Sequence, residues 1–208
     1  MDPTGLSAFT AHWTGLGADP GAAAAAHADV LARWGEPHRA YHDRAHLAAC
    51  LAAFGSVRAL TTDPDAVAIA LWYHDAVYDP RGHDNEGESA ALARRHLGPA
   101  GARPDAVARV VGLIDATRHA AVPADDDARL LVDIDLGVLG APPDRYARYE
   151  EEIRREYAWV PADVFRAKRA EILRGFLARP RIYATAAFAD REAAARANLA
   201  WAIARLGG

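Results

Sequence analysis

Three segments of the chain carry histidine and aspartate side chains at spacings that could hold a divalent metal ion. They are residues 41–47 (YHDRAHL), residues 72–79 (WYHDAVYD) and residues 133–136 (DIDL). Imidazole nitrogens and carboxylate oxygens hold borderline or hard divalent cations, and a His-Asp doublet inside an otherwise apolar helix pattern is hard to explain by packing. Two carboxylates would cancel the charge of the ion, while neutral imidazoles add donors without charge. The segments therefore predict metal-dependent hydrolysis.

The doublet His74-Asp75 carries most of this argument. Neighbouring residues on a helix point about 100° apart and rise about 1.5 Å, so both side chains can converge on one ion beside the helix. A lone histidine or aspartate is more often a hydrogen-bonded core residue, but the further segments favour a site. His46 lies within an apolar helix pattern and is expected to face the ion. His42 shares its helix face if the helix already includes Tyr41, and could otherwise cap the helix or contact substrate.

Two further positions are left with alternatives. Asp133 and Asp135 are spaced by two and cannot share a helix face, so one is expected to bind and the other to be solvated or salt-bridged; Asp135 is preferred. His119 follows a predicted helix end, where it could serve substrate or act only as a cation at a helix C-terminus.

Composition limits the classes of protein that the chain can belong to. With 208 residues and 51% hydrophobic content it can bury a sizeable core as one domain, and a net charge of −4 gives no general attraction for nucleic acid. The single cysteine, Cys50, excludes an internal disulfide and any cysteine-based zinc site. No leader peptide or long apolar run is found, so a soluble, cytoplasmic protein with no membrane partner is expected.

Apolar residues recur at helical spacing along the whole chain, which predicts an all-α bundle of about ten helices. Asp-Pro pairs at residues 19–20 and 63–64, together with Pro104, Pro143 and Pro161, suit helix starts, and Gly98 and Gly140 suit helix ends. The expected helices are 5–15, 20–34, 43–60, 64–78, 85–97, 104–118, 125–139, 143–157, 161–178 and 189–206. Residues 1–208 are read as one domain, with 143–208 a C-terminal helical extension packed on the metal-binding core, and the loop 79–84 is expected to border the site.

The order of a histidine, a His-Asp doublet and a distant aspartate resembles the HD superfamily of metal-dependent phosphohydrolases. It maps onto His46, His74, Asp75 and Asp135. The flanking text YHDRAHL, HDAVYD, DNEGESA and DIDLGVLG, and the C-terminal run, are similar to one bacterial subfamily of predicted HD phosphohydrolases, from about residue 35 to the end. The resemblance implies an all-α HD-domain helical bundle, a bound divalent metal and hydrolysis of phosphate esters, often of nucleotides, without fixing the substrate.

One departure from that family concerns the catalytic carboxylate. Some HD nucleotidases place a glutamate three residues after the aspartate of the doublet, where this chain has Tyr78. Glu86 is the first replacement and Asp79 the second, each to manage the proton of the water or the leaving group.

The resulting hypothesis is that His46, His74, Asp75 and Asp135 hold one divalent ion, with Mn, Mg, Co, Fe, Ni and Zn not distinguished, which activates water against phosphorus. The residues expected to bind phosphate are His42, Arg44, Arg118 and His119, and a second ion becomes conceivable if both histidines are ligands. The partner is a small phosphorylated substrate, with no nucleic acid polymer, and homodimerisation is left open. The alternatives are an HD-fold di-iron oxygenase and a non-catalytic nucleotide-binding helical protein.

Overall fold

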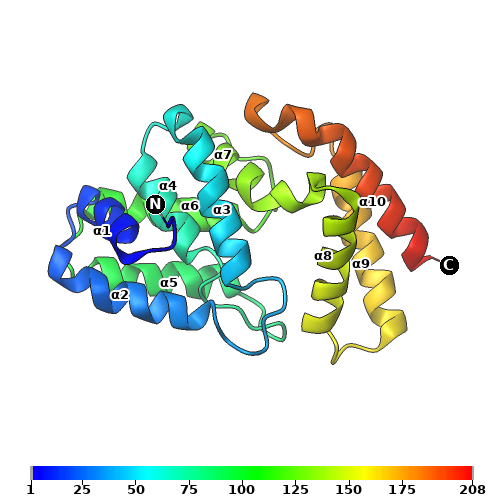
Figure 1. Ribbon diagram of the computed structural model, residues 1–208, viewed down its shortest axis with the longest axis horizontal. Helices are drawn as coiled ribbons and strands as arrows, with labels where there is room; N and C mark the ends of the chain where they lie inside the picture. The colour runs from blue at the N-terminus through cyan, green and yellow to red at the C-terminus, as the bar shows by residue number, and fades with distance from the viewer. Residues whose placement is uncertain (1, 208) are drawn as a thin grey trace. The chain divides into compact units, whose positions relative to one another are not determined.

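The computed structural model describes residues 2–207, which form ten α-helices, three short 3-10 helices and no strand (Figure 1). The helices are α1 (Leu6–Gly15), α2 (Pro20–Arg33), α3 (Arg44–Val57), α4 (Pro64–Tyr73), α5 (Asn85–Leu97), α6 (Pro104–Ala116), α7 (Asp126–Asp135), α8 (Pro143–Glu156), α9 (Ala162–Leu177) and α10 (Glu192–Leu206). The 3-10 helices are η1 (Arg58–Leu60), η2 (Leu136–Gly140) and η3 (Ala186–Arg191). The predicted all-α bundle of about ten helices is confirmed.

Contacts within the chain divide it into two compact units, residues 1–134 and 135–208. The boundary falls inside α7, so Asp135 is covalently the last residue of a helix that otherwise belongs to the first unit. The predicted domain organisation, a single domain with an extension from residue 143, stays a prediction. Among the described helices, none is long and apolar enough to cross a membrane.

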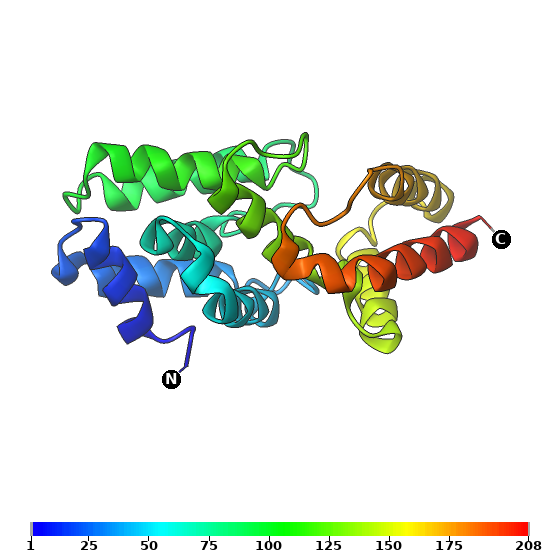
Figure 2. The same ribbon diagram turned by 90° about the horizontal axis from the view of Figure 1, so that it is seen from above.

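Helix α4 is the centre of the first unit. Every residue from Ala66 to Tyr73 is buried, because the helix contacts α1, α3, α5 and α6 on its several sides. In Figure 2, α4 lies between the α1–α2 pair and the α5–α6 pair. A helix that is apolar all round needs such complete cover. Its start is fixed by Pro64 at the first position and by Asp63, whose carboxylate accepts the amide of Ala66 at 3.0 Å.

The ends of several helices differ from the prediction. Helix α4 stops at Tyr73 instead of residue 78, although the His74 amide still donates to the Ala70 carbonyl at 2.8 Å. The doublet thus closes the helix instead of lying inside it. Helix α3 begins only at Arg44, because Asp43 is its N-cap and accepts the amides of Ala45 and His46. His42 therefore precedes the helix.

Most of the residues predicted to begin or end helices do so in the structure, with two exceptions. Pro104 and Pro143 open α6 and α8, and Gly98 follows the end of α5. Pro161 is the residue before α9 instead of a member of its first turn. Asp19 precedes α2, but its side chain makes no capping hydrogen bond.

The second unit consists of α8, α9 and α10 with η2 and η3 (Figure 1). Helix α10 packs on α9, α8 and η2. The buried Asn198 side chain of α10 donates to the carbonyls of Leu139 and Ala141 at 2.8 and 2.9 Å, and Glu192 accepts the amides of Ile182 and Tyr183. These polar contacts satisfy backbone groups at the end of η2 and in the loop before η3, which have no helical partners.

Candidate metal centre

Helix α3 supplies a histidine and a thiol from the same face. His46 is 6% exposed and Cys50, one helical turn later, is 2% exposed. The Cys50 Sγ lies 3.8 Å from His46 Nδ1 and 3.7 Å from His46 Nε2. Residues four apart on a helix are neighbours, which is why the thiol reaches the imidazole. Tyr41 and Trp34 pack their rings against His46, with ring centroids 4.7 and 6.0 Å away.

The end of α4 supplies the doublet, and its geometry fixes the protonation of one ring nitrogen. His74 is fully buried, and its Nδ1 lies 2.8 Å from the Leu71 carbonyl oxygen. A carbonyl oxygen only accepts, so Nδ1 carries the proton and donates it. The other nitrogen, Nε2, lies 3.3 Å from His46 Nε2 and 3.3 Å from Asp75 Oδ2, and it is the atom that a neutral His74 would offer to an ion. This orientation by a main-chain acceptor is typical of histidines that bind metals.

The distances within the cluster fit donors that share one ion. Bonds of about 2.0–2.2 Å place neighbouring N and O donors roughly 3.0–3.6 Å apart and opposite donors about 4.2 Å apart. The two separations from His74 Nε2 are both 3.3 Å, and His46 Nε2 lies 4.0 Å from Asp75 Oδ2. A proton on His46 Nε2 can bridge the two nitrogens when no ion is bound. The residues present thus fit a divalent ion.

Asp135, at the end of α7, completes the group. Single donor atoms of His46, Cys50, His74 and Asp135 all lie within 4.8 Å of one another. Asp135 is partly exposed, whereas Asp133 is fully buried. Three of the four residues expected as ligands, His46, His74 and Asp135, lie in this group; Asp75 lies outside it but contacts the two histidines, and its place as a ligand stays a prediction. Cys50 is an addition, so the exclusion of cysteine was too broad for a mixed donor set.

Helix α7 is anchored at its start by Asp127. This carboxylate is 1% exposed and accepts the Thr62 amide (2.8 Å), the Thr62 hydroxyl (2.7 Å), the Asp63 amide (3.0 Å) and Arg109 Nη2 (3.0 Å). Burial by itself would raise the pKa of Asp127, but the hydrogen bonds from Thr62, Asp63 and Arg109 outweigh it and lower the pKa below its ordinary value. The start of α7 is thereby joined to the start of α4.

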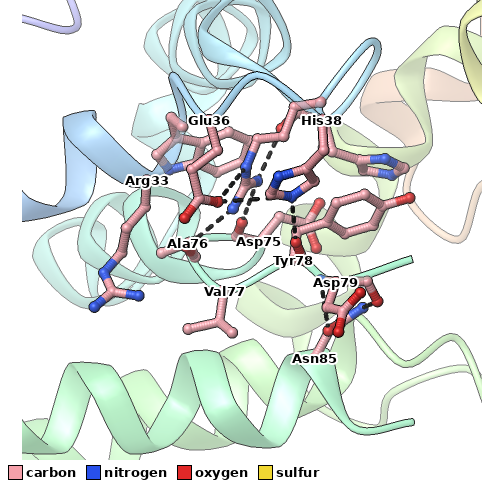
Figure 3. Close-up of polar contacts among 12 residues, drawn as sticks. Arg33, Glu36, His38, Asp75, Ala76, Val77, Tyr78, Asp79 and Asn85 are labelled. Atoms are coloured by element: carbon pink, nitrogen blue, oxygen red, sulfur yellow. Dashed lines mark hydrogen bonds and ion pairs between the residues drawn. The ribbon is translucent and has the colours of Figure 1, made fainter. Parts of the chain in front are cut away.

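Arg39 is a residue of this region that sequence reasoning missed. Its Nη1 donates to the carbonyls of His42 (2.9 Å) and Asp75 (2.7 Å), its Nη2 to the carbonyl of Ala76 (3.1 Å), and its Nε to Glu36 (3.1 Å). Figure 3 labels three of these partners, Glu36, Asp75 and Ala76, and draws their contacts as dashed lines. These bonds hold the segment after α4 outside the helix, because the carbonyls of Asp75 and Ala76 face Arg39 instead of a further helical turn.

The predicted phosphate-binding residues lie in different surroundings. The half-buried His42 has its ring centroid 5.9 Å from that of His46 and stacks on Tyr78 at 4.2 Å, so it borders the cluster. Arg44 instead donates from Nε to the Leu31 carbonyl of α2 at 3.0 Å. The structure gives Arg44 a packing role between α3 and α2, and its predicted substrate contact stays a prediction.

Arg118 is surrounded by carboxylates. It lies 2.6 Å from Asp84, 3.4 Å from Asp115 and 3.6 Å from Glu86, the residue expected to handle a proton. The hydrogen bond to Arg118 lowers the pKa of Asp84, and the same contact raises the pKa of Arg118. The pairing of Glu86 with Arg118 joins the start of α5 to the end of α6.

Two more predicted residues occupy turns. Asp79 is exposed, and its carboxylate accepts the Arg81 amide at 2.8 Å while its own amide donates to Asn85 Oδ1 at 3.0 Å (Figure 3). It thus organises the loop before α5. His119 follows the end of α6 with a positive φ of 54°, a left-handed conformation that ends the helix. No described contact of Glu86, Asp79 or Arg118 reaches the cluster, and their roles in the reaction stay predictions.

Comparison with models of known protein families found no match, and comparisons with curated proteins and with solved structures found none either.

Proposed function

We propose that this chain is a metal-dependent phosphohydrolase of the HD type, with His46, His74, Asp75 and Asp135 as the ligands of a divalent ion and a small phosphorylated metabolite, such as a nucleotide, as substrate. The observation that carries the proposal is that donor atoms of His46, His74 and Asp135 lie within 4.8 Å of one another, while Asp75 contacts both histidines. The HD resemblance supplies the reaction class. The donor set supports a bound ion, because imidazole nitrogens and carboxylate oxygens are the groups that hold divalent cations.

A bound divalent ion would supply a water of lowered pKa and would polarise a phosphoryl oxygen. The chain's own residues prepare that chemistry. His74 is held as a donor of its Nε2 lone pair by the hydrogen bond from Nδ1 to Leu71. The Asp75 carboxylate, 16% exposed, adds negative charge beside both histidines. Trp34, Tyr41 and the neighbouring core exclude water from the back of the cluster.

His42 is the residue best placed to contact the substrate. It stands beside His46 and keeps part of its side chain accessible. Its ring packs on Tyr78, which holds the position where some HD nucleotidases have a glutamate. We therefore assign His42 to the phosphate or its proton. We assign the proton of the water or the leaving group to Glu86 or Asp79, which lie at the start of α5 and in the loop before it.

The test is phosphate release from a panel of nucleotides and sugar phosphates by protein loaded with Mn²⁺, Co²⁺ or Mg²⁺. Asp75→Ala should abolish release, since it removes a charged donor from the cluster. Asp105→Ala is the matched control, because Asp105 is an exposed aspartate in the first turn of α6. It should retain full activity.

Release that a chelator and Asp75→Ala both remove, while Asp105→Ala retains it, supports the proposal and identifies the substrate class. If metal-loaded wild-type protein releases no phosphate from any compound, the hydrolase assignment is wrong. Iron content and oxygen uptake then test the oxygenase alternative, and nucleotide binding without turnover tests the non-catalytic one.

A further inference from the structure

The two segments that bring the histidine ligands together are not helical where they approach one another. Residues 38–43 precede α3 in an irregular conformation, and residues 74–79 form the turn that follows α4. Within the second segment the backbone hydrogen bonds come from a turn and from other elements, such as Ala76 N to Tyr73 O at 2.9 Å, Val77 N to Ser89 Oγ at 3.0 Å and Asp79 N to Asn85 Oδ1 at 3.0 Å. The distance between the two segments must therefore be fixed by something other than helical hydrogen bonding.

Two side chains provide that link: His38, whose Nε2 lies 2.7 Å from the Tyr78 carbonyl oxygen, and Arg39, which reaches both segments with three hydrogen bonds. One nitrogen of Arg39, Nη1, donates to a carbonyl in each segment, 2.9 Å to His42 and 2.7 Å to Asp75, and Nη2 adds the carbonyl of Ala76 at 3.1 Å. Three of the four hydrogen bonds of Arg39 thus go to main-chain carbonyls, and only the bond to Glu36 goes to a carboxylate. A guanidinium presents its donors in a rigid plane, so these contacts set a spacing and do more than neutralise a charge.

The Arg39 side chain is enclosed by its neighbours. It is 0% exposed, whereas its partner Glu36 is 37% exposed. Its guanidinium lies 5.4 Å from the ring centre of Trp34 and 5.5 Å from that of Tyr78. Trp34 is fixed in turn by a hydrogen bond of 2.9 Å from its Nε1 to the Trp72 carbonyl. Aromatic rings and a planar cation attract one another, which keeps the fork in one orientation.

We infer that Arg39 is a positioning residue of the metal centre: it sets the separation between the His46 segment and the His74-Asp75 segment and thereby the affinity for the ion. The inference rests on the proposed function, since it assumes that the cluster binds a metal. Arg39 itself touches none of the ligand side chains in the described contacts. It acts through the Asp75 backbone, whose carboxylate lies 3.3 Å from His74 and 4.0 Å from His46.

The test uses Arg39→Lys, which keeps the positive charge but replaces the fork with a single ammonium that cannot reach three carbonyls. Arg169→Lys is the matched control, because Arg169 is also buried and also makes paired hydrogen bonds, here to Glu150 at 2.7 and 3.0 Å in the second unit. The affinity for Co²⁺ and its visible absorption spectrum are measured for the full chain. Hydrogen exchange of residues 39–46 and 74–79 is measured without metal.

Loss of partners that orient metal ligands typically lowers metal affinity about 10–100-fold, and we expect a loss of this size in Arg39→Lys with a changed Co²⁺ spectrum. Exchange in both segments should become faster. Arg169→Lys should bind Co²⁺ as the wild type does, even if it unfolds at a lower temperature. Wild-type affinity in Arg39→Lys, or an equal loss in both variants, would overturn the inference.

Failure of the proposed function would look different. In that case the wild-type protein itself would bind no Co²⁺, Mn²⁺ or Zn²⁺, and the role of Arg39 toward an ion would fall with it. The exchange measurement would still decide whether Arg39 holds the two segments, because unchanged exchange in Arg39→Lys would reject the link itself.

Discussion

Asp127→Asn is expected to destabilise the first unit far more than a neighbouring substitution of the same kind. The native carboxylate accepts four hydrogen bonds, two of them from Thr62. An amide has one acceptor oxygen, so it can keep the three donors that now face Oδ2, but its NH2 group then meets the Thr62 amide, which is left without a partner. The three remaining bonds lose the strength that the negative charge gave them.

The magnitude follows from those losses. An unsatisfied buried donor costs about 1–3 kcal/mol, and bonds to a charged group exceed neutral ones by roughly 1 kcal/mol each. The lower cost of burying an amide instead of a carboxylate offsets part of this, so we expect a net loss of about 3 kcal/mol in the free energy of unfolding. In domains of this size that corresponds to a fall of roughly 6–12 °C in Tm.

The assay is thermal and urea unfolding followed by circular dichroism. Asp126→Asn is the control, because the Asp126 side chain is 83% exposed and its ion pair within residues 2–207 is with Arg129, one turn away. The free energy of unfolding of this variant should stay within about 0.5 kcal/mol of the wild-type value, as is usual for surface substitutions. If the two variants unfold alike, the assignment of Asp127 as the anchor of α7 is wrong.

The same variant makes a prediction about pH. Because the pKa of Asp127 is lower in the folded chain than in the unfolded chain, the carboxylate contributes stability at neutral pH that is lost as the pH falls through the folded pKa. The unfolding free energies of wild type and Asp127→Asn should therefore converge below about pH 4, near the ordinary aspartate value. A constant difference between pH 7 and pH 3 would contradict this reasoning.

Two further predictions concern the thiol and the packing of the second unit. Cys50→Ser should weaken Zn²⁺ binding about tenfold or more while leaving Mn²⁺ binding nearly unchanged in calorimetric titrations, since sulfur prefers the softer ion; equal effects on both ions would mean that Cys50 only packs. Gly140→Ala should destabilise the second unit, because an added Cβ would lie 2.7 Å from Arg191 Cβ and 3.0 Å from the Arg191 carbonyl oxygen. Gly175→Ala in α9 meets nothing within 4 Å and should instead stabilise by about 0.5–1 kcal/mol, so a reversed order of melting temperatures would refute the packing argument.

The helices could be predicted because their signals are local. Pro64 and Pro143 begin helices, and apolar periodicity marks the buried faces between them. The end of α4 could not be predicted in this way, since apolar and aromatic residues continue through Val77 and Tyr78. Side chains that are distant in sequence occupy the carbonyls around this end: Trp34 takes that of Trp72, and Arg39 takes those of Asp75 and Ala76.

In the candidate site, too, residue types and short spacings could be used for prediction, whereas tertiary contacts could not. The residue types at His46, His74, Asp75 and Asp135 indicated metal chemistry before any geometry was known. The four-residue spacing of His46 and Cys50 was a signal that sequence reasoning could have used, but a lone cysteine was dismissed by count. The engagement of Arg44 with Leu31 and of Arg118 with Asp84 depends on tertiary contacts that no spacing in the sequence indicates.

The anchor at Asp127 has a consequence for how the chain can change in evolution. It ties the beginnings of α4 and α7, and the ends of the same two helices carry His74 and Asp135, which meet in the candidate centre. Two helices that are joined at their first residues and meet again at their last residues must have matched lengths, here about 15 Å each at 1.5 Å per residue. One residue inserted into either helix would turn its terminal ligand by about 100°. We therefore expect α4 and α7 to tolerate substitutions on their faces but no insertion or deletion, whereas the loop between α5 and α6 is under no such constraint.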